Sequence, residues 1–330
     1  MTEFSSPPLE MLWEKDDAAE VLAARFGFSD SAAVGQWVAA TVGVHWGVEV
    51  ESVSRIVMSG HNALAWISAS SGSYLAKWSV LPERFRRLSV LTQLTAWLGE
   101  RGLPVSEPVA SVDGRVQLEV GGGTSISLQH QISGQLLDVT DRDQVRAAGA
   151  ALAKLHAALA RYPGTAEAGE LADPPKLLAT RITEWLDSDH SSALSPSARE
   201  KLISLVASTR SDRLAAQLVH GDFRAANILC AGNQVAAVLD FEEARIDFPI
   251  MELAQSAVML GTRFRDWGPV PPHVHAWLLD GYESERPLTS AEAGWWKLLV
   301  LWFSLVLVPS GEDPTGWGPA ADRILARMAV

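Results

Sequence analysis

The sequence predicts an α+β fold in which strands gather in the first part of the chain and helices dominate the rest. Short runs rich in β-branched and aromatic residues, separated by Ser-Gly and Ser-Ser-Gly turns, lie between residues 53 and 132. Capping signals and apolar residues at helical spacing follow from residue 140 onward. Strands grouped in one segment and helices in another are typical of α+β proteins.

The first part of the chain begins with helices and continues as an antiparallel meander. Residues 16–42 have a helical pattern, and Ser29 or Asp30 would cap a second helix within them. Three strand-like runs follow, at residues 53–58, 63–69 and 73–80. Lys77 lies on the third run, and a lysine on a strand is ordinarily a solvated edge residue.

A helix and three more strand-like runs complete this part. Residues 83–101 place leucines on one face of a helix, which ends at Gly102 with Pro104 just beyond. Asp113 and Gly114 are a strong hairpin signal between their flanking runs. The three runs are residues 105–112, 115–120 and 125–132.

Helix-start signals mark the second part. They stand at residues 140–143, 195–196 and 289–292. The apolar run at residues 295–308 contains Lys297 and is closed by Pro309. It is too short to span a bilayer, so it predicts a buried helix.

The most informative segment is His-Gly-Asp-Phe-Arg-Ala-Ala-Asn, residues 220–227, followed by Asp240. Asn227 stands five residues after Asp222, and Asp240 stands thirteen residues after Asn227. Apolar runs flank all three, so these oxygen-bearing side chains are held at the rim of a core. Because an unpaired carboxylate is costly to bury, such a cluster usually meets a cation or a substrate.

This spacing fits the catalytic-loop pattern H-x-D-x-x-x-x-N of phosphoryl transfer from ATP. Asp222 is then the base that orients and deprotonates the attacking hydroxyl, while Asn227 and Asp240 hold Mg²⁺. Lys77, upstream on its strand, would bind the α- and β-phosphates. Each fragment alone is as readily a turn or a cap, and it is their order and intervals that favour catalysis.

With these motifs the chain resembles the aminoglycoside phosphotransferase-like superfamily, which includes choline kinases and type II homoserine kinases. The resemblance runs from about residue 50 to about residue 260. The matching segments are residues 131–134, 152–156, 220–229 and 238–242.

The resemblance implies a bilobal, protein-kinase-like fold. A small N-terminal lobe would contain a five-stranded antiparallel sheet plus a helix, and a larger C-terminal lobe would be mainly helical. The nucleotide-binding lobe is expected at residues 1–132, with the N-terminal helices at about 16–42. The catalytic and acceptor-binding lobe is expected at residues 133–330.

The resemblance also implies further site residues, with ATP and Mg²⁺ as cofactors. The turn with Ser59 and Asn62 would lie over the phosphates, although it is poor in glycine and equally consistent with a plain hairpin. The backbone from Gln129 to Gln131 would bind the adenine edge. Arg224 would neutralise transition-state charge, and a salt bridge to a neighbouring acid is its alternative.

The sequence departs from the family pattern at two positions. Glu252 stands where members usually carry an aspartate before Leu-Ala, and glutamate can serve the same structural role. Gln93 stands where a glutamate facing the strand lysine is expected. Glu83 and Glu100 remain as alternative partners of Lys77.

Composition narrows the class of function. The chain has 330 residues, 48% hydrophobic and 20% charged, as expected for a globular protein. Its net charge of −12 argues against nucleic acid and anionic membranes as partners and would suit a cationic acceptor. The single cysteine, Cys230, excludes an internal disulfide. The first ten residues lack the features of a signal peptide, so a cytoplasmic location is expected.

These observations predict a kinase that phosphorylates a hydroxyl of a small molecule. Acceptors of the aminoglycoside, homoserine and choline type are left open, as are a monomer and a homodimer. The alternative is a nucleotide-binding pseudokinase that acts as a scaffold, which only Gln93 supports. Protein-kinase activity is disfavoured because no A-P-E-like segment follows Asp240.

Overall fold

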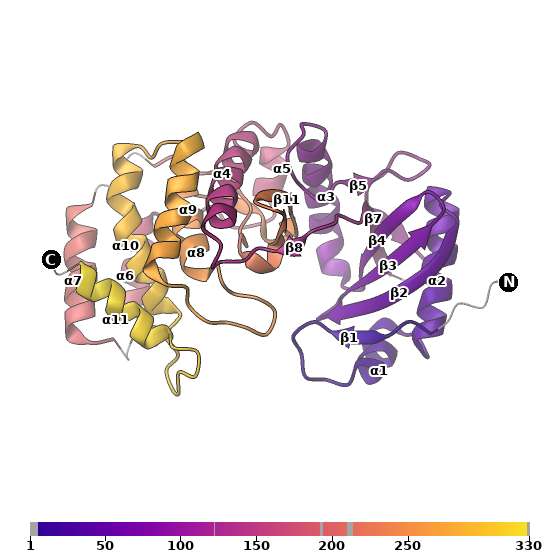
Figure 1. Cartoon of the computed structure of the whole chain (residues 1–330), viewed down its shortest axis with the longest axis horizontal. Helices are drawn as coiled ribbons and strands as arrows, with labels where there is room; N and C mark the ends of the chain where they lie inside the picture. The colour runs from indigo at the N-terminus through magenta and orange to yellow at the C-terminus, as the bar shows by residue number, and fades with distance from the viewer. Residues whose placement is uncertain (1–5, 122, 192–193, 210–213, 329–330) are drawn as a thin grey trace. The chain divides into compact units, whose positions relative to one another are not determined.

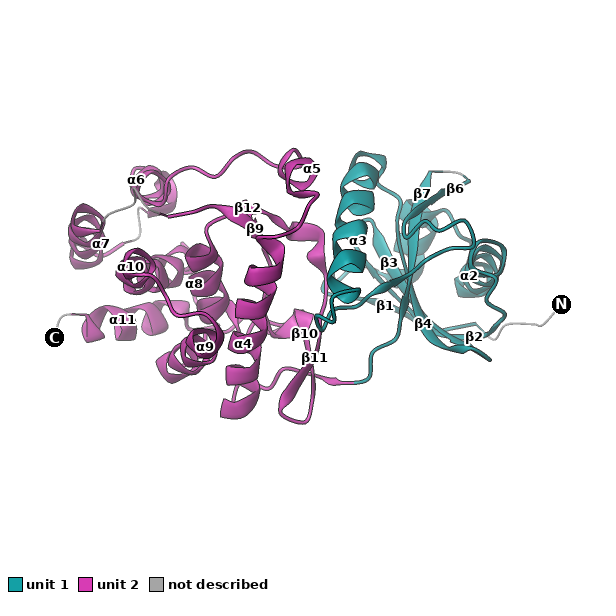
Figure 2. Cartoon of the chain, turned by 90° about the horizontal axis from the view of Figure 1, so that it is seen from above, with its two compact units in different colours: residues 1–133 teal, residues 134–330 magenta. Residues whose placement is uncertain are grey.

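The computed structural model describes residues 6–121, 123–191, 194–209 and 214–328. The chain divides into two compact units, Met1–Ser133 (unit 1) and Gly134–Val330 (unit 2), which Figure 2 shows in different colours. The predicted α+β class is confirmed, because unit 1 contains a large sheet and unit 2 is mainly helical (Figure 1). Within the described ranges, no helix has the length and apolar character needed to cross a membrane.

Unit 1 is built on a seven-stranded sheet, whereas five strands were expected. Its path runs β1-β2-β3-β4-β7-β5, and β6 pairs with β7 beside that path. The strands are β1 Leu9–Met11, β2 Val50–Ser59, β3 Asn62–Ala69, β4 Gly72–Ser79, β5 Pro108–Val109, β6 Leu118–Val120 and β7 Thr124–His130. The sheet is also not wholly antiparallel, since β1 joins β2 in parallel. A strand of three residues is too short to show a period of two, which is why the pattern did not reveal it.

The segments around Asp113 and Gly114 do not form the expected hairpin. Gly114 turns with a φ of 83°, but β5 and β6 each pair with β7 instead of with each other. The Ser111 hydroxyl accepts the Arg115 N–H at 3.1 Å, and the Asp113 carboxylate accepts from the Arg115 guanidinium at 2.6 Å. Main-chain bonds from the Ser111 N–H to the Arg115 carbonyl and from the Gly114 N–H to the Ser111 carbonyl close the turn together with these side chains.

Helices cover both faces of the sheet, with α2 (Ser31–Trp46) on one face and α3 (Phe85–Gly99) on the other (Figure 2). Asp30 caps α2, as predicted, by accepting the Ala33 N–H at 2.8 Å. The buried residues of α2 recur at four-residue spacing and pack on β2, β3 and β4. They include Val34, Val38, Val42 and Trp46. A short α1 (Ala18–Val21) and a π-helix (Leu22–Phe26) precede α2 and pack on the same face.

Unit 2 packs helices around two small sheets. Its helices are α4 Arg142–Leu159, α5 Thr165–Gly169, α6 Leu178–Leu186, α7 Pro196–Ser208, α8 Pro249–Met259, α9 Pro272–Glu285, α10 Ser290–Val306 and α11 Trp317–Arg327. One sheet has the order β11-β10-β8 and the other pairs β12 with β9. These strands are β8 Gln135–Leu136, β9 Gln217–Val219, β10 Ile228–Ala231, β11 Gln234–Val238 and β12 Arg245–Asp247.

Two of the three predicted helix starts in unit 2 are confirmed, and the third is displaced by one residue. Ser195 caps α7, and Thr289 and Glu292 form the complete capping box of α10. For α4, however, the cap is Asp141, whose carboxylate accepts the N–H groups of the next turn, rather than Thr140. Thr140 instead donates its hydroxyl to Asp138 at 2.8 Å, so the carboxylate one residue later takes the capping position.

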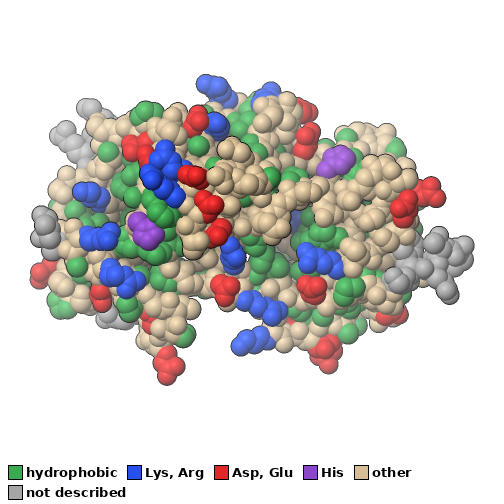
Figure 3. Space-filling model, viewed as in Figure 1, with side chains coloured by type: hydrophobic (Ala, Val, Ile, Leu, Met, Phe, Trp, Pro, Cys, Tyr) green, Lys and Arg blue, Asp and Glu red, His purple; other side chains and the backbone are tan. Residues whose placement is uncertain are grey.

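Charged side chains are mixed on the surface shown in Figure 3. Lysine and arginine stand among aspartate and glutamate over that face, and no single acidic area dominates it.

Candidate active site

The predicted catalytic segment lies in unit 2, where it leads from β9 to β10. His220 is fully buried, and its Nε2 donates to the Leu239 carbonyl at 2.8 Å. Its Nδ1 accepts the backbone N–H of Asp222 at 3.2 Å. These partners assign the neutral ring with its proton on Nε2. His220 thus fastens the loop that carries Asp222 to the end of the strand that leads to Asp240.

Gly221 occupies a position that only glycine fits. Its φ is +89°, and a Cβ atom there would lie 2.1 Å from the Glu243 carbonyl oxygen. Its N–H donates to the Glu252 carboxylate, and its carbonyl accepts from Arg245 Nη1 at 3.4 Å. The peptide just before Asp222 is therefore held from two sides.

The Asp222 carboxylate is held by two neighbours of the same segment. Arg224 Nε donates to Oδ1 at 2.8 Å, and Asn227 Nδ2 donates to Oδ2 at 2.8 Å. Asn227 Nδ2 also donates to the Asp222 carbonyl at 2.9 Å. Because the amide nitrogen of Asn227 serves Asp222, a metal-binding role of Asn227 would fall to its amide oxygen. The Asp222 side chain is 25% exposed, which leaves it accessible to a reactant.

Asn227 and Asp240 stand at the same end of the β10–β11 hairpin. Ile228 pairs with Val238 in the antiparallel register, and the Leu239 N–H donates to the Asn227 carbonyl at 2.8 Å. The main chain thus places the residue before β10 beside the residues after β11. Asp240 is exposed and has a φ of 60°, the one positive value among the described non-glycine residues. Such conformations cluster at functional sites.

These two side chains suit a magnesium ion that also takes phosphate ligands. Both offer hard oxygen donors, and Mg²⁺ is usually held by one or two protein groups plus substrate phosphates and water. Among the described residues, no group of three or more histidine, cysteine, aspartate or glutamate side chains could hold a metal ion.

Arg224 takes the salt bridge that was its alternative role. Its side chain is 11% exposed and bonds Asp222, and its guanidinium lies 5.5 Å from the ring centroid of the exposed Trp267. Its Nη1 atom is buried and has no hydrogen-bond partner within the described part of the chain. A buried donor without a partner is costly, so this atom is suited to donate to an anionic group that enters the site.

A pocket beside Asp222 was missed by the sequence analysis. It is lined by the segment that contains Asp222 and by one face of α8. The α8 residues are Glu252, Gln255, Ser256 and Met259. Their spacing of three and four residues is that of one helix face, and this is the signal that could have found them. No motif singles these residues out.

Glu252 keeps the structural role that the sequence assigned to it. It is 3% exposed, and its carboxylate accepts from His156 Nε2 at 2.7 Å, from the His220 N–H at 3.1 Å and from the Gly221 N–H. Burial raises the pKa of Glu252, but its contacts with His156, His220 and Gly221 together outweigh burial, so that pKa lies below its ordinary value. A buried carboxylate thus holds two successive peptides of the catalytic segment.

Lys77 lies in unit 1, in the middle of the sheet and not at an edge. β4 is flanked by β3 and β7, and Lys77 pairs with Leu64 and Ser127 across them. Its neighbours Ala76 and Trp78 belong to the core beneath α2. Because side chains alternate along a strand, Lys77 is on the opposite face of the sheet, which is the face of α3. Gln93, on α3, is exposed.

The other predicted nucleotide contacts also lie in unit 1. Ser59 and Asn62 pair across the β2–β3 turn. The Gln129 side chain on β7 accepts the Ser106 hydroxyl at 2.7 Å, and the Gln131 N–H donates to the Ser73 carbonyl at 2.9 Å. At Gln131, therefore, the carbonyl is the backbone group that a ligand could use.

The β2–β3 turn is tied to the segment before α1. Glu14 accepts the Gly60 N–H at 3.2 Å, and Arg25 donates to the Gly60 carbonyl at 3.3 Å. These contacts occupy the backbone of the one glycine in that turn, which limits its use as a phosphate cradle.

The structure thus brings together Asp222, Arg224, Asn227 and Asp240 within unit 2. It holds the second group of predicted residues, which are Lys77, Ser59, Asn62, Gln129 and Gln131, within unit 1. Joint action of the two groups on one nucleotide stays a prediction.

A sequence profile of the phosphotransferase enzyme family (APH) matches residues 61–288. Among curated proteins, homoserine kinase of Neisseria meningitidis serogroup B is 25% identical over 250 residues, which cover 74% of this chain and 77% of that protein. Homoserine kinase of Methylobacillus flagellatus is 28% identical over 205 residues, which cover 62% of this chain and 61% of that protein.

Solved structures with the same fold include two antibiotic kinases. Amicoumacin kinase hAmiN, in complex with AMP-PNP, Ca²⁺ and its antibiotic, has a TM-score of 0.59 at 15% identity, covering 89% of this chain and 92% of that one. Macrolide 2′-phosphotransferase MphH of Brachybacterium faecium has a TM-score of 0.59 at 17% identity, covering 82% of this chain and 89% of that one. At these identities the likeness concerns the fold.

Proposed function

The chain belongs to the phosphotransferase enzyme family, and on this premise we propose that it transfers the γ-phosphoryl group of ATP, with Mg²⁺, to a hydroxyl of a small molecule. The observation that carries the proposal is the arrangement at the end of the β10–β11 hairpin. There Asp222, Asn227 and Asp240 bring a carboxylate, an amide and a second carboxylate together in the order and spacing that phosphoryl transfer uses.

Asp222 acts as the base in this proposal. The acceptor oxygen forms a bond to the γ-phosphorus, the bond from that phosphorus to the bridging oxygen of ADP breaks, and the hydroxyl proton passes to the Asp222 carboxylate. The hydrogen bonds from Arg224 and Asn227 orient this carboxylate before the acceptor arrives. When the transition state of phosphoryl transfer is loose, with little bonding to either oxygen, positioning of this kind provides much of the rate enhancement.

Asn227 and Asp240 would hold the magnesium ion through their side-chain oxygens. When bound, Mg²⁺ supplies neutralisation of the charge that develops on the phosphate oxygens. The left-handed conformation of Asp240 and the bond between Leu239 and Asn227 keep the two ligands at one end of the hairpin.

In unit 1, Lys77 would bind the nonreacting phosphates of ATP. Its central strand supports this role, because pairing on both sides fixes the backbone from which the lysine side chain extends. Ser59 and Asn62 would approach the phosphates from the β2–β3 turn, and the backbone around Gln129 and Gln131 would bind adenine.

The acceptor would enter the pocket between the catalytic segment and α8. That pocket has an amide, a hydroxyl and a thioether from Gln255, Ser256 and Met259. Arg224 could add a positive charge for a transferring phosphoryl or an acceptor anion, since its Nη1 is buried without a partner in the described chain. Because curated relatives are named homoserine kinases, a hydroxy amino acid is the first acceptor to test, with other amine-bearing alcohols after it.

A coupled assay of ADP release over hydroxy amino acids, amino alcohols, sugars and aminoglycosides tests this function. We expect ADP to form with one acceptor class only and to require a divalent cation. Tight nucleotide binding without ADP formation for any class would support the scaffold alternative instead. A cytoplasmic location and the oligomeric state stay predictions that this assay leaves aside.

A further inference from the structure

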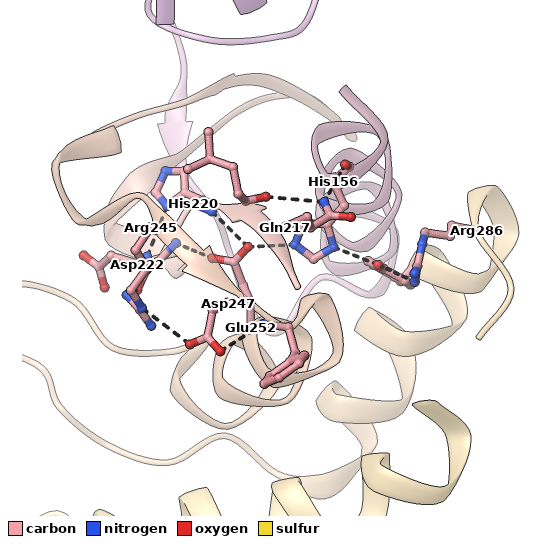
Figure 4. A network of polar contacts seen from close by, with 12 residues as sticks. His156, Gln217, His220, Asp222, Arg245, Asp247, Glu252 and Arg286 are labelled. Carbon is pink, nitrogen blue, oxygen red and sulfur yellow. Dashed lines mark hydrogen bonds and ion pairs between the residues drawn. The ribbon is translucent and has the colours of Figure 1, made fainter. Parts of the chain in front are cut away.

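A continuous chain of hydrogen bonds leads from the catalytic segment to the corner between α9 and α10 (Figure 4). Glu252 accepts from His156 Nε2 at 2.7 Å, and His156 Nδ1 lies 2.7 Å from the Tyr282 hydroxyl. Arg286 Nη1 donates to that hydroxyl at 2.9 Å. His156, Tyr282 and Glu252 are at most 3% exposed, so water does not compete for these bonds.

The donors and acceptors of these groups allow all the bonds of the chain to run in one direction. Arg286 can only donate, so the Tyr282 oxygen accepts from it. In the neutral tautomer of His156 that has its proton on Nε2, Nδ1 is an acceptor and the Tyr282 hydroxyl donates to it. The Glu252 carboxylate can only accept, so His156 carries its proton on Nε2. Burial raises the pKa of Tyr282, which keeps the phenol in the protonated form that this order requires.

The outer end of the chain is anchored to the start of α10. Arg286 Nη2 donates to Glu292 at 2.7 Å, and the other Glu292 oxygen accepts the N–H and the hydroxyl of Thr289 at 2.9 Å. Arg286 therefore donates one hydrogen bond to the capping box of α10 and another to the Tyr282 hydroxyl. Its side chain is 30% exposed, which makes it the one member of the chain near solvent.

Two glycines allow α4 and α9 to approach closely enough for this contact. A Cβ atom on Gly149 would lie 2.1 Å from the Leu278 carbonyl, and one on Gly281 would lie 2.0 Å from the Arg146 carbonyl. The backbones of the two helices are therefore in direct contact. This close approach brings the His156 ring on α4 beside the Tyr282 ring on α9, at 5.6 Å between centroids.

We propose that Tyr282, oriented by Arg286, is a positioning residue for Asp222. Its hydroxyl fixes the tautomer and the orientation of the His156 ring. His156 then orients the Glu252 carboxylate. Glu252 holds the backbone N–H groups of His220 and Gly221, immediately before Asp222. The inference rests on the proposed kinase function, since it assigns a task to residues remote from the reacting atoms. Its consequence is that the α9–α10 corner affects turnover while leaving the binding of nucleotide and acceptor unchanged.

Tyr282→Phe is the direct test, because it removes one hydroxyl and leaves the ring in place. We expect kcat to fall by about 10- to 100-fold, as for a small displacement of a catalytic group, while both KM values stay within about twofold. Arg286→Ala should give a similar loss, and Arg286→Lys should recover part of it because lysine can still donate to Tyr282.

A matched control is available at the same helix pair. Glu285 on α9 forms an exposed ion pair with Lys154 on α4 at 3.1 Å, so Glu285→Gln weakens the same interface without touching the buried chain. We expect kcat of this variant to equal that of the wild type. An equal loss in Glu285→Gln and Tyr282→Phe, or a Tyr282→Phe enzyme with wild-type kcat, would overturn the proposal.

Hydrogen exchange provides a second readout that does not require turnover. In Tyr282→Phe and Arg286→Ala, the amides of His220 and Gly221 should exchange at least about tenfold faster than in the wild type. If the wild type shows no kinase activity but this change occurs, the proposed function fails and the positioning survives. Unchanged exchange in an active enzyme, with kcat preserved, would overturn the positioning alone.

Discussion

The two units hold their candidate functional residues by different means. In unit 1, Lys77 and Gln129 stand on paired central strands, so main-chain ladders and strand alternation direct their side chains. In unit 2, Asp222 stands on an irregular segment that is held by the buried side chains of His220 and Glu252. A strand tolerates changes of its neighbours better than a loop that depends on single hydrogen bonds. We therefore expect a substitution in unit 2 to displace functional residues at a greater distance than a substitution in unit 1 does.

The largest effect should come from the base itself. Asp222→Asn keeps the size of the side chain and removes its ability to accept a proton, so kcat should fall by about 1,000-fold. Nucleotide affinity should stay the same, which equilibrium binding of ADP can measure. Asp113→Asn, at an exposed turn of unit 1, is the matched control. Full activity of Asp222→Asn would remove the basis of the proposed chemistry.

Loss of Asp240, the second proposed metal ligand, should lower nucleotide affinity as well as kcat. Asp240→Ala should weaken Mg²⁺-dependent ATP binding by about 100-fold, while the smaller, metal-independent part of binding stays. Calorimetric titration with and without Mg²⁺ separates the two. Asp280→Ala, at an exposed aspartate of unit 2 that pairs with Arg146, should bind as the wild type does. Equal affinity of Asp240→Ala and the wild type in Mg²⁺ would exclude Asp240 as a ligand.

Glu252 should link the stability of unit 2 to pH. Its pKa lies below the ordinary value of 4.5 in the folded state. Its stabilisation is therefore complete above that value and is lost as pH falls through the lower, folded pKa. Glu252→Gln should lower the free energy of unfolding by about 2 kcal/mol at neutral pH and flatten this acid dependence. Denaturant unfolding between neutral and acid pH checks it, and an unchanged acid limb in the variant would contradict the assignment.

The smallest effect should be seen in unit 1. Lys77→Ala should raise the KM for ATP by about tenfold through the loss of one charge-assisted contact, with no detectable change in folding because the strand stays paired on both sides. Arg115→Ala, which removes an exposed arginine of the same unit, is the control. A large loss of stability in Lys77→Ala would show that the lysine serves the sheet instead.

The sequence was sufficient to predict those features in which a chemical requirement or the spacing of apolar residues determines the residue type. The turn signals identified the β2–β3–β4 meander, and the spacing of Asp222, Asn227 and Asp240 pointed to side chains that the structure holds at one end of the β10–β11 hairpin. It was insufficient where contacts between distant residues determine which strands form and pair. The Leu9–Met11 strand exists through its pairing with β2, and the segments on either side of the Asp113 turn pair with β7 instead of with each other.

The pocket residues and the chain of hydrogen bonds beyond His156 illustrate the same limit. Gln255 and Ser256 carry no motif, and only their helix face places them beside Asp222. Tyr282 stands 126 residues after His156, so no local pattern could connect the two. Glycines at α4 and α9 were the available hint, because a glycine within a helix often marks a close approach of backbones.

The most direct test of the central claim is ³¹P NMR of the enzyme with ATP, Mg²⁺ and a hydroxylated acceptor. We predict a new phosphomonoester resonance that grows as fast as ADP and is absent in Asp222→Asn. ADP accompanied only by inorganic phosphate, with every acceptor class, would mean transfer to water and would contradict the assignment of Asp222, Asn227 and Asp240 as the centre of a small-molecule kinase.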